Sequence, residues 1–388
     1  MFCFHKFLVG SLPFCHPLRG ISAGALRHSI IPQRCSSDAL WHSIIPQRCS
    51  SDESSMGTPL DLVQHWQRVF EANGIPEAQE SSEYIVSFVL GAKTFQSLPV
   101  QMISRTVTEE QWQQVERLST ERLLRMPVQY VIGEWDFGGM TLKMRPPVFI
   151  PRPETEELVK LAVDELSREK TFPGSGQMEQ QQALQTLYAD VVDYGPDGFS
   201  LHLLHPIIMD IGCGSGAISL SLLQKLPQGR VVSVDKREEA VNLTRENADR
   251  LHLADRIQIL HHNILSDPLD ELLRYAPVDM IVSNPPYILE EDMTGLAPEI
   301  LSYEDHDALY GGTDGLMVIK AILSLAAKLL KDSGSVFLEV DPRHPEMIVK
   351  WLTACPRLQL HVAAVHEDFC GKLRFLHLQK TKAPDLYN

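Results

Sequence analysis

The strongest constraint on the fold is an alternation of short apolar runs with helix-like segments that begins near residue 207. Each apolar run is long enough for one buried strand, and the segments between the runs have the apolar spacing of amphipathic helices. The strand-like runs are PIIMD, RVVSVD, RIQIL, VDMIVSN and SVFLEV, with two more around 358–365 and 373–378. This alternation predicts an α/β fold with a mostly parallel, doubly wound sheet of seven strands and binding sites at the carboxyl ends of the strands.

The chain of 388 residues has room for one large and one smaller domain. Residues 56–127 show helical spacing of their apolar side chains, which predicts a small all-helical N-terminal domain. Residues 128–150 are rich in β-formers and glycine and predict a connecting hairpin, and 151–380 form the predicted α/β domain. Within that domain, 169–205 are polar and low in complexity, which indicates an inserted surface loop.

Residues 1–55 have the composition of a leader. No acidic residue precedes Asp38, whereas basic residues alternate with phenylalanine and leucine. This composition is typical of an organellar transit peptide, and we predict import into the mitochondrial matrix; a non-targeting, disordered tail is the alternative. The segment HSIIPQRCSSD occurs twice, at 28–38 and 42–52. Two copies are too few for a solenoid, and we assign them no function.

The charge balance favours a protein substrate over nucleic acid. The first 50 residues hold five basic side chains and one acid, so the remainder has 30 basic against 49 acidic side chains, a balance of −19. A surface of this sign repels a phosphate backbone, so we predict no direct nucleic-acid binding. The cysteines of the body form no C-x-x-C pair and no Cys/His set at ligand spacing, which predicts no metal site. No apolar run reaches 18 residues, so we predict no membrane span. We also expect the protein to be a monomer.

A glycine-rich turn, DIGCGSGAI, follows the first strand of the α/β domain at 210–218. Its glycines permit a tight turn and close approach of a ligand to backbone N–H groups. The spacing is G-x-G-x-G and not the G-x-G-x-x-G of a dinucleotide site, and Asp210 favours a cationic or zwitterionic ligand over a pyrophosphate. Asp235 ends the second strand, where it is placed to accept hydrogen bonds from a ribose diol. The glycines alone also suit a plain strand–helix joint.

Together these features resemble the S-adenosylmethionine (SAM) site of class I methyltransferases. By that resemblance Asn263, which ends the third strand, lies near the adenine, and its Oδ1 can accept from the adenine amino group. The predicted cofactor-binding residues are Asp210, Gly212, Cys213, Gly214, Ser215, Gly216, Asp235, Asn263 and Asn284.

The sequence SNPPYI, which ends the next apolar run, predicts the reacting loop. Asn284 Oδ1 and the Pro285 carbonyl are two acceptors for the N–H protons of an amide or exocyclic amine, and they orient its nitrogen toward a methyl donor. The fixed φ of proline keeps this loop rigid, and Tyr287 offers a flat face to a planar group. No general base is needed, because the product nitrogen can lose its proton after transfer. An Asn-Pro turn that merely ends a strand is the alternative.

This loop is typical of amino-group methyltransferases, whose substrates are adenine N6, cytosine N4 or a glutamine amide. The segments PVQYVIGEWDFGG, VFIPRPETEELV, SNPPYI, LAPEI, ALYGGTDGL, FLEVDPRHPE and DFCGKLRFL resemble, in this order, the protein-(glutamine-N5) methyltransferases that modify peptide-chain release factors. The resemblance covers roughly residues 60–378. With the leader, it implies SAM as cofactor, the glutamine of the Gly-Gly-Gln tripeptide of mitochondrial release factors as substrate, and a helical domain that binds the factor elsewhere.

The resemblance also implies roles for residues around the reacting loop. Phe137 is expected to pack near the cofactor. The implied substrate-binding residues are Arg152, Pro153, Glu154, Thr155, Asn284, Pro285, Pro286 and Tyr287, of which Asn284, Pro285 and Tyr287 are catalytic. A helix start with an acidic first turn is the alternative for the PRPETE segment. Glu339 and Asp341 are interpreted as a strand end.

Two other functions stay open at this point. N6-adenine methylation of DNA or RNA suits the same loop, and it predicts a basic groove that the acidic body argues against. A scaffold that senses SAM or binds a translation factor without turnover is the other, and the retention of every acceptor in the loop argues against it.

Overall fold

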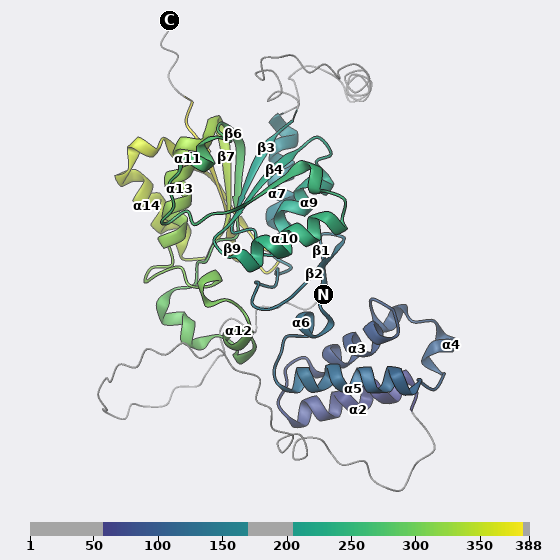
Figure 1. Cartoon of the computed structure of the whole chain (residues 1–388). Helices are drawn as coiled ribbons and strands as arrows, with labels where there is room; N and C mark the ends of the chain where they lie inside the picture. Colours follow the sequence, from purple (N-terminus) through teal and green to yellow (C-terminus); the bar gives the residue numbers. More distant parts are fainter. Residues whose placement is uncertain (1–56, 170–204, 383–388) are drawn as a thin grey trace, which may run out of the picture. The chain divides into compact units, whose positions relative to one another are not determined.

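The computed structural model describes residues 57–169 and 205–382, which form two compact units with a boundary between Leu123 and Leu124 (Figure 1). The predicted leader, its duplicated segment and positions 170–204 of the predicted insertion lie outside the described residues. Within the described ranges, no helix has the length and apolar character needed to cross a membrane.

The smaller unit is helical, as its apolar spacing predicts. Its described elements are α2 (Pro59–Ala72), α3 (Ala78–Val89), η2 (Phe95–Ser97), α4 (Val100–Ile103) and α5 (Glu109–Leu123). Helix α2 begins with a capping box, in which Thr58 and Asp61 each accept from the other's backbone N–H. The three longer helices bury an apolar core that includes Phe70, Ile85 and Val115.

The larger unit contains a seven-stranded sheet in the order β5-β4-β3-β6-β7-β9-β8. Its strands are β3 (Ile207–Ile211), β4 (Arg230–Asp235), β5 (Ile257–His261), β6 (Val278–Ser283), β7 (Leu330–Glu339), β8 (Leu360–Glu367) and β9 (Leu373–Lys380). The first five pair in parallel, whereas β9 is antiparallel to β7 and β8. The predicted fold class, a mostly parallel seven-stranded sheet with a small helical domain, is confirmed.

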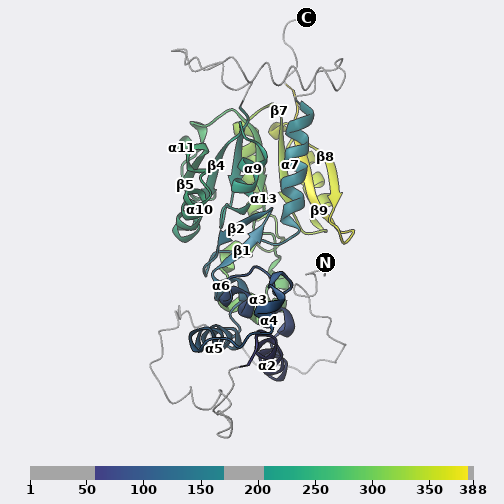
Figure 2. The same cartoon turned by 90° about the vertical axis from the view of Figure 1, so that its right-hand side faces the viewer.

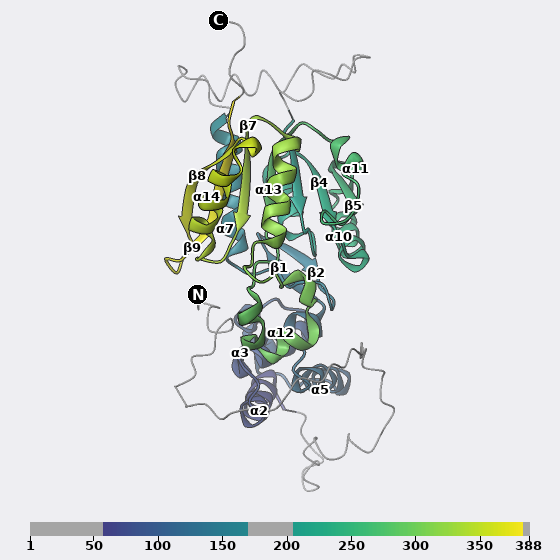
Figure 3. The ribbon, with the colours of Figure 1, turned by 90° about the vertical axis from the view of Figure 1, so that its left-hand side faces the viewer.

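Helices cover both faces of this sheet. On one face lie α7 (Thr155–Glu169), α9 (Ala217–Lys225) and α10 (Glu238–Arg250), which face the viewer in Figure 2; on the other lie α11 (Asp270–Leu273), α13 (Met317–Leu329) and α14 (His344–Ala354), as Figure 3 shows. Successive strand residues alternate between the two layers: Ile208 packs with α7 and α9, and Met209 packs with α13. Because the strands are buried on both faces, they read as continuous apolar runs in the sequence.

The segment predicted as a hairpin at 128–150 is more varied. Residues Val128–Ile132 form a short helix, α6, which ends at Gly133 with φ of 72°. The hairpin itself is β1 (Glu134–Phe137) and β2 (Met140–Lys143), joined by Gly138 and Gly139 at positive φ. Pro127 is the N-cap residue of this helix, where its missing N–H removes no intrahelical hydrogen bond. Residues that favour strands, Val128, Val131 and Ile132 among them, therefore lie in a helix here.

Candidate active site

The connection order of the sheet places the site. The chain runs outward through β3, β4 and β5, and then returns to β6 on the other side of β3, so adjacent loops separate at the carboxyl ends of β3 and β6. A cavity of about 1120 Å³, its open mouth included, lies at these strand ends. A second cavity, of about 420 Å³ with its open mouth included, shares Phe149, Asn284, Pro285 and Ala308 with the first.

The glycine-rich turn forms one wall of the larger cavity. Gly212, Gly214 and Gly216 have φ of 79°, 55° and 84°, which L side chains rarely adopt. A Cβ on Gly214 meets nothing within 4 Å, and one on Gly212 meets only the Asn284 carbonyl oxygen at 3.9 Å. The turn therefore leaves open space beside its backbone. Gly216 instead packs against Thr244, at 3.0 Å from a built Cβ, and starts α9.

Asp235 ends β4 and lines the larger cavity. Its carboxylate accepts from the Gly214 N–H at 3.0 Å and from the Arg237 N–H at 2.9 Å, which fixes its orientation. Burial raises the pKa of Asp235, and the two backbone hydrogen bonds oppose that rise. Each carboxylate oxygen keeps a further lone pair, as a ligand with a diol requires.

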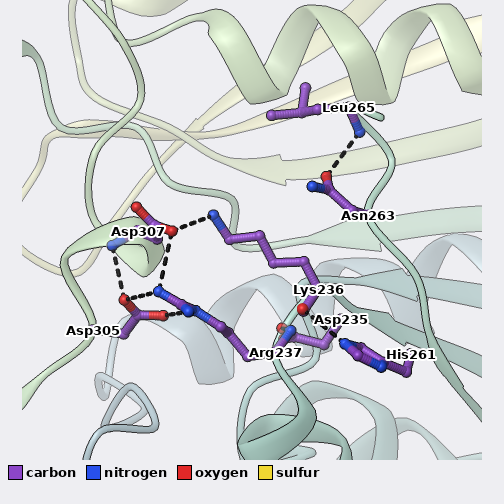
Figure 4. Close-up of polar contacts among 8 residues, drawn as sticks. All are labelled: Asp235, Lys236, Arg237, His261, Asn263, Leu265, Asp305 and Asp307. Atoms are coloured by element: carbon purple, nitrogen blue, oxygen red, sulfur yellow. Dashed lines mark hydrogen bonds and ion pairs between the residues drawn. The ribbon is translucent and has the colours of Figure 1, made fainter. Parts of the chain in front are cut away.

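An ion-pair cluster forms the rim beside Asp235 (Figure 4). Arg237 binds both carboxylate oxygens of Asp305, at 2.6 and 2.9 Å, and one of Asp307 at 3.1 Å. Lys236 binds Asp307 at 3.0 Å. Since these two basic residues are already paired with carboxylates, the rim does not suit a pyrophosphate, which agrees with the G-x-G-x-G spacing.

Asp210 is fully buried one residue before the end of β3 and lies outside the lining of both cavities. One oxygen accepts from the N–H and the hydroxyl of Ser219, whereas Oδ1 has no partner among the described residues. Burial raises the pKa of Asp210 to about 7, against the opposing hydrogen bonds from Ser219. Because Asp210 lines neither cavity, it acts on a ligand there through the negative charge of its ionised form, which favours a ligand that carries positive charge.

Replacing Asp210 by asparagine is expected to stabilise the ligand-free protein at alkaline pH. Below about pH 4 the carboxyl group is protonated in both the folded and unfolded states and contributes nothing. Between pH 4 and about 7 the unfolded chain ionises first, so wild-type folding loses free energy, to a total on the order of 4 kcal/mol above pH 7. Denaturant unfolding of wild type and Asp210→Asn at pH 5 and pH 8 tests this: the gain must be larger at pH 8, and an equal gain contradicts it.

The reacting loop follows β6 directly. Asn284, Pro285 and Pro286 line the larger cavity, and Asn284, Pro285 and Tyr287 line the smaller one. Asn284 therefore stands where the two cavities meet. Its Nδ2 donates to Thr155 Oγ1 at 3.1 Å, which leaves Oδ1 as an acceptor.

Arg152 lines the smaller cavity, and its guanidinium lies 4.6 Å from the centre of the Phe149 ring. Its Nη2 donates to Glu304 at 2.7 Å. Glu304 is almost fully buried and also accepts from the Ile150 N–H at 3.3 Å. Burial lowers the pKa of Arg152, but the charge and hydrogen bond of Glu304, together with Tyr130 and Tyr287, raise it overall. Arg152 is thus a fixed cation at the wall of the cavity.

The structure brings most of the predicted site residues together. Those that line the larger cavity are Thr155, Gly212, Cys213, Gly214, Ser215, Asp235, Asn263, Asn284, Pro285 and Pro286. Asn263 Oδ1 already accepts from the Leu265 N–H at 3.0 Å (Figure 4).

Other predicted site residues lie behind these walls. Asp210 and Gly216 support the turn, as described above. Phe137, at the end of β1, is 2% exposed and packs in the core that the hairpin forms with α7 and α9. It lines neither cavity. Pro153 and Glu154 also line neither cavity; they precede α7, which begins at Thr155.

Sequence reasoning missed several charged residues near the site. Glu304, Asp305 and Asp307 support Arg152 and Arg237, and Glu339 contacts Thr155 and Tyr287. The available signal for Glu339 was its place at the end of the apolar run SVFLEV, where the carboxyl end of a strand meets the site.

Comparison with known proteins gives two family matches. A "Methyltransferase small domain" family matches residues 189–336, and a "PrmC N-terminal domain" family matches residues 61–133. The "MTRF1L release factor glutamine methyltransferase" of Homo sapiens is 52% identical over 328 residues, which cover 84% of this chain and 89% of that protein. The "Release factor glutamine methyltransferase" of Streptococcus pneumoniae is 34% identical and covers 73% of this chain and 88% of its own. That of Fusobacterium nucleatum is 33% identical and covers 76% and 72%.

Proposed function

This chain belongs to the release factor glutamine methyltransferases, and from that premise we propose that it methylates the N5 amide nitrogen of the Gly-Gly-Gln glutamine in mitochondrial release factors. SAM, when bound, supplies the methyl group as an electrophilic sulfonium. The observation that carries the proposal is Asn284, which lies between a large cavity suited to a nucleoside with positive charge and a small cavity with mainly apolar walls.

The residues of the larger cavity fit this cofactor. Asp235 offers lone pairs to a ribose diol, and the open glycine turn allows close approach of the ligand to the backbone. Asp210, behind the glycine turn, adds a negative charge when it is ionised, which favours a cationic group over a phosphate. In this proposal Asn263 lies beside the adenine, and Phe137 stabilises the wall from behind.

The smaller cavity holds the acceptor amide. Asn284 Oδ1 and the Pro285 carbonyl accept its two N–H protons, which holds the nitrogen toward the larger cavity and encourages lone-pair density there. Phe149 and Tyr287 line this cavity and offer flat surfaces to a planar amide. The ion pair between half-buried Arg152 and buried Glu304 keeps that wall rigid.

The wider context supports an organellar protein substrate. The acidic body repels nucleic acid, which disfavours adenine as the acceptor, and the leader composition supports the mitochondrial matrix as the location. The helical unit is the proposed second binding site for the release factor, and the enzyme is proposed to act as a monomer.

A direct assay tests the proposal. Purified protein is incubated with isotopically labelled SAM and a mitochondrial release factor, and the factor is analysed by peptide mass spectrometry. We expect one methyl group on the Gly-Gly-Gln glutamine, and none after that glutamine is replaced by asparagine. Label in an added DNA or RNA duplex, with none in the factor, supports the adenine alternative instead.

A further inference from the structure

Glu339 is a buried carboxylate that the reaction outlined above does not use. It ends β7, is 2% exposed and lines neither cavity. Its Oε2 accepts from the Thr155 hydroxyl at 2.7 Å, and its Oε1 accepts from the Tyr287 hydroxyl at 3.1 Å. Both donors belong to the walls of the cavities on either side of Asn284.

The hydrogen bonds around Glu339 run in one direction. On one side Asn284 Nδ2 donates to Thr155, and Thr155 donates to Glu339. On the other side Arg374, held by Asp368 at 2.9 Å, donates to Tyr287, and Tyr287 donates to Glu339. A carboxylate only accepts, so it obliges both hydroxyl groups to donate toward it.

This direction has a consequence for Asn284. Because the single hydrogen of the Thr155 hydroxyl points to Glu339, Thr155 has only lone pairs to offer to Asn284. The amide group must then turn its NH₂ toward Thr155 and its oxygen away. An oxygen facing Thr155 is left opposite another acceptor and makes no hydrogen bond there, which disfavours that orientation.

We propose that Glu339 is a positioning residue that fixes the amide orientation of Asn284 through Thr155. This inference rests on the proposed function, because it explains why Asn284 Oδ1 is the atom available to a substrate N–H. Glu339 acts through another residue and touches no substrate. Glu339 thereby keeps the Asn284 amide group in one of its two flipped orientations before the substrate binds.

The test changes the hydrogen-bond donors and acceptors at positions 284 and 339. Asn284→Asp removes the NH₂ group and places an acceptor opposite the acceptor Thr155, so we expect a loss of turnover of at least about 100-fold. Glu339→Gln frees the Thr155 hydroxyl to donate to the new carboxylate. The double variant is therefore expected to turn over at least about tenfold faster than Asn284→Asp alone, a double-mutant coupling measured with the release-factor assay. Burial raises the pKa of Glu339; the nearby charge of Arg374 opposes this rise, and that of Glu154 adds to it. The assays are therefore run at pH 8.5, which favours the ionised form of Glu339.

Removal of charge repulsion between two carboxylates also predicts a rescue, so a third background separates the explanations. With Thr155→Val present, a relay through the hydroxyl cannot operate, and the rescue by Glu339→Gln must vanish; a rescue that persists assigns it to charge and overturns the proposal. Thr155→Ser should keep at least about tenfold more activity than Thr155→Val, because it retains the hydroxyl.

Thermal unfolding of the same variants gives a readout that needs no methyl transfer. The loss of melting temperature caused by Asn284→Asp should be several degrees smaller in the Glu339→Gln background than in wild type, and this difference should disappear with Thr155→Val. Additive losses in unfolding overturn the positioning role even when the wild type is active. Absence of wild-type methylation with intact coupling in unfolding overturns the proposed function alone.

Discussion

Asn284→Ala is expected to lower kcat for methylation of the release factor by about 10²- to 10³-fold, the range seen when one preorganised polar contact is removed from a reacting centre. The variant keeps the rigid Pro285–Pro286 backbone and the Pro285 carbonyl, but the acceptor amide loses one of its two anchors and is no longer held toward the donor. The loss should appear in kcat. The Kd for SAM, measured by calorimetry, should change by less than about threefold, because most of the cavity wall is unaltered.

Asn242→Ala is the matched control. This asparagine is exposed on α10, where its side chain accepts only from Arg245 among the contacts described. It lines neither cavity. Its activity should equal that of wild type. Equal turnover of Asn284→Ala and Asn242→Ala excludes the assigned role of the loop. A loss confined to SAM affinity shows that Asn284 contacts the cofactor and not the acceptor amide.

Much of the sheet could be predicted because its strands are buried on both faces. Ile208 and Met209 face opposite helix layers, so neither side tolerates polar residues and the run stands out. The helix at Val128–Ile132 was predicted as part of a hairpin, since five residues are too few to establish a helical period. Tertiary packing decides such short segments.

The site divides in a similar way. Residues whose role depends on backbone shape or on a strand end, such as Gly214 and Asp235, are visible in local spacing. Glu304 and Glu339 act across 152 and 184 positions of the chain, on Arg152 and Thr155. No local pattern records such partners, because a charged residue after an apolar run suits a solvated loop equally well.

The segment GGTDG shows how a motif can act from outside the site. Gly311 packs against the reacting loop. Its N–H donates to the Ile288 carbonyl at 2.8 Å, and the Ile288 N–H donates to the Leu309 carbonyl at 2.9 Å. A Cβ built on Gly311 lies 2.8 Å from the Tyr287 Cα and 2.7 Å from the Gly315 carbonyl oxygen. Both neighbours are backbone atoms, which cannot move aside as a flexible side chain does.

Gly311→Ala is therefore expected to displace Tyr287 and the smaller cavity. Overpacking of this kind costs about 1–3 kcal/mol of folding free energy. A shift of the acceptor site by about 1 Å lowers kcat by roughly 10²-fold, since orientation of the amide is the main contribution of the loop. Steady-state kinetics with the release factor and denaturant unfolding measure the two effects, and SAM affinity should change little because Gly311 lines neither cavity.

Gly295→Ala is the control for the same chemical change. Gly295 is exposed at the end of η5 (Glu290–Gly295), and a Cβ there meets nothing within 4 Å. Stability should stay within about 0.5 kcal/mol of wild type, and turnover should be unchanged. If Gly311→Ala matches this control in kcat, close backbone packing does not hold the reacting loop, and its rigidity must come from Pro285 and Pro286 alone. If kcat falls while unfolding is unaltered, the strain is confined to the loop, and the glycine serves the position of Tyr287 more than the stability of the fold.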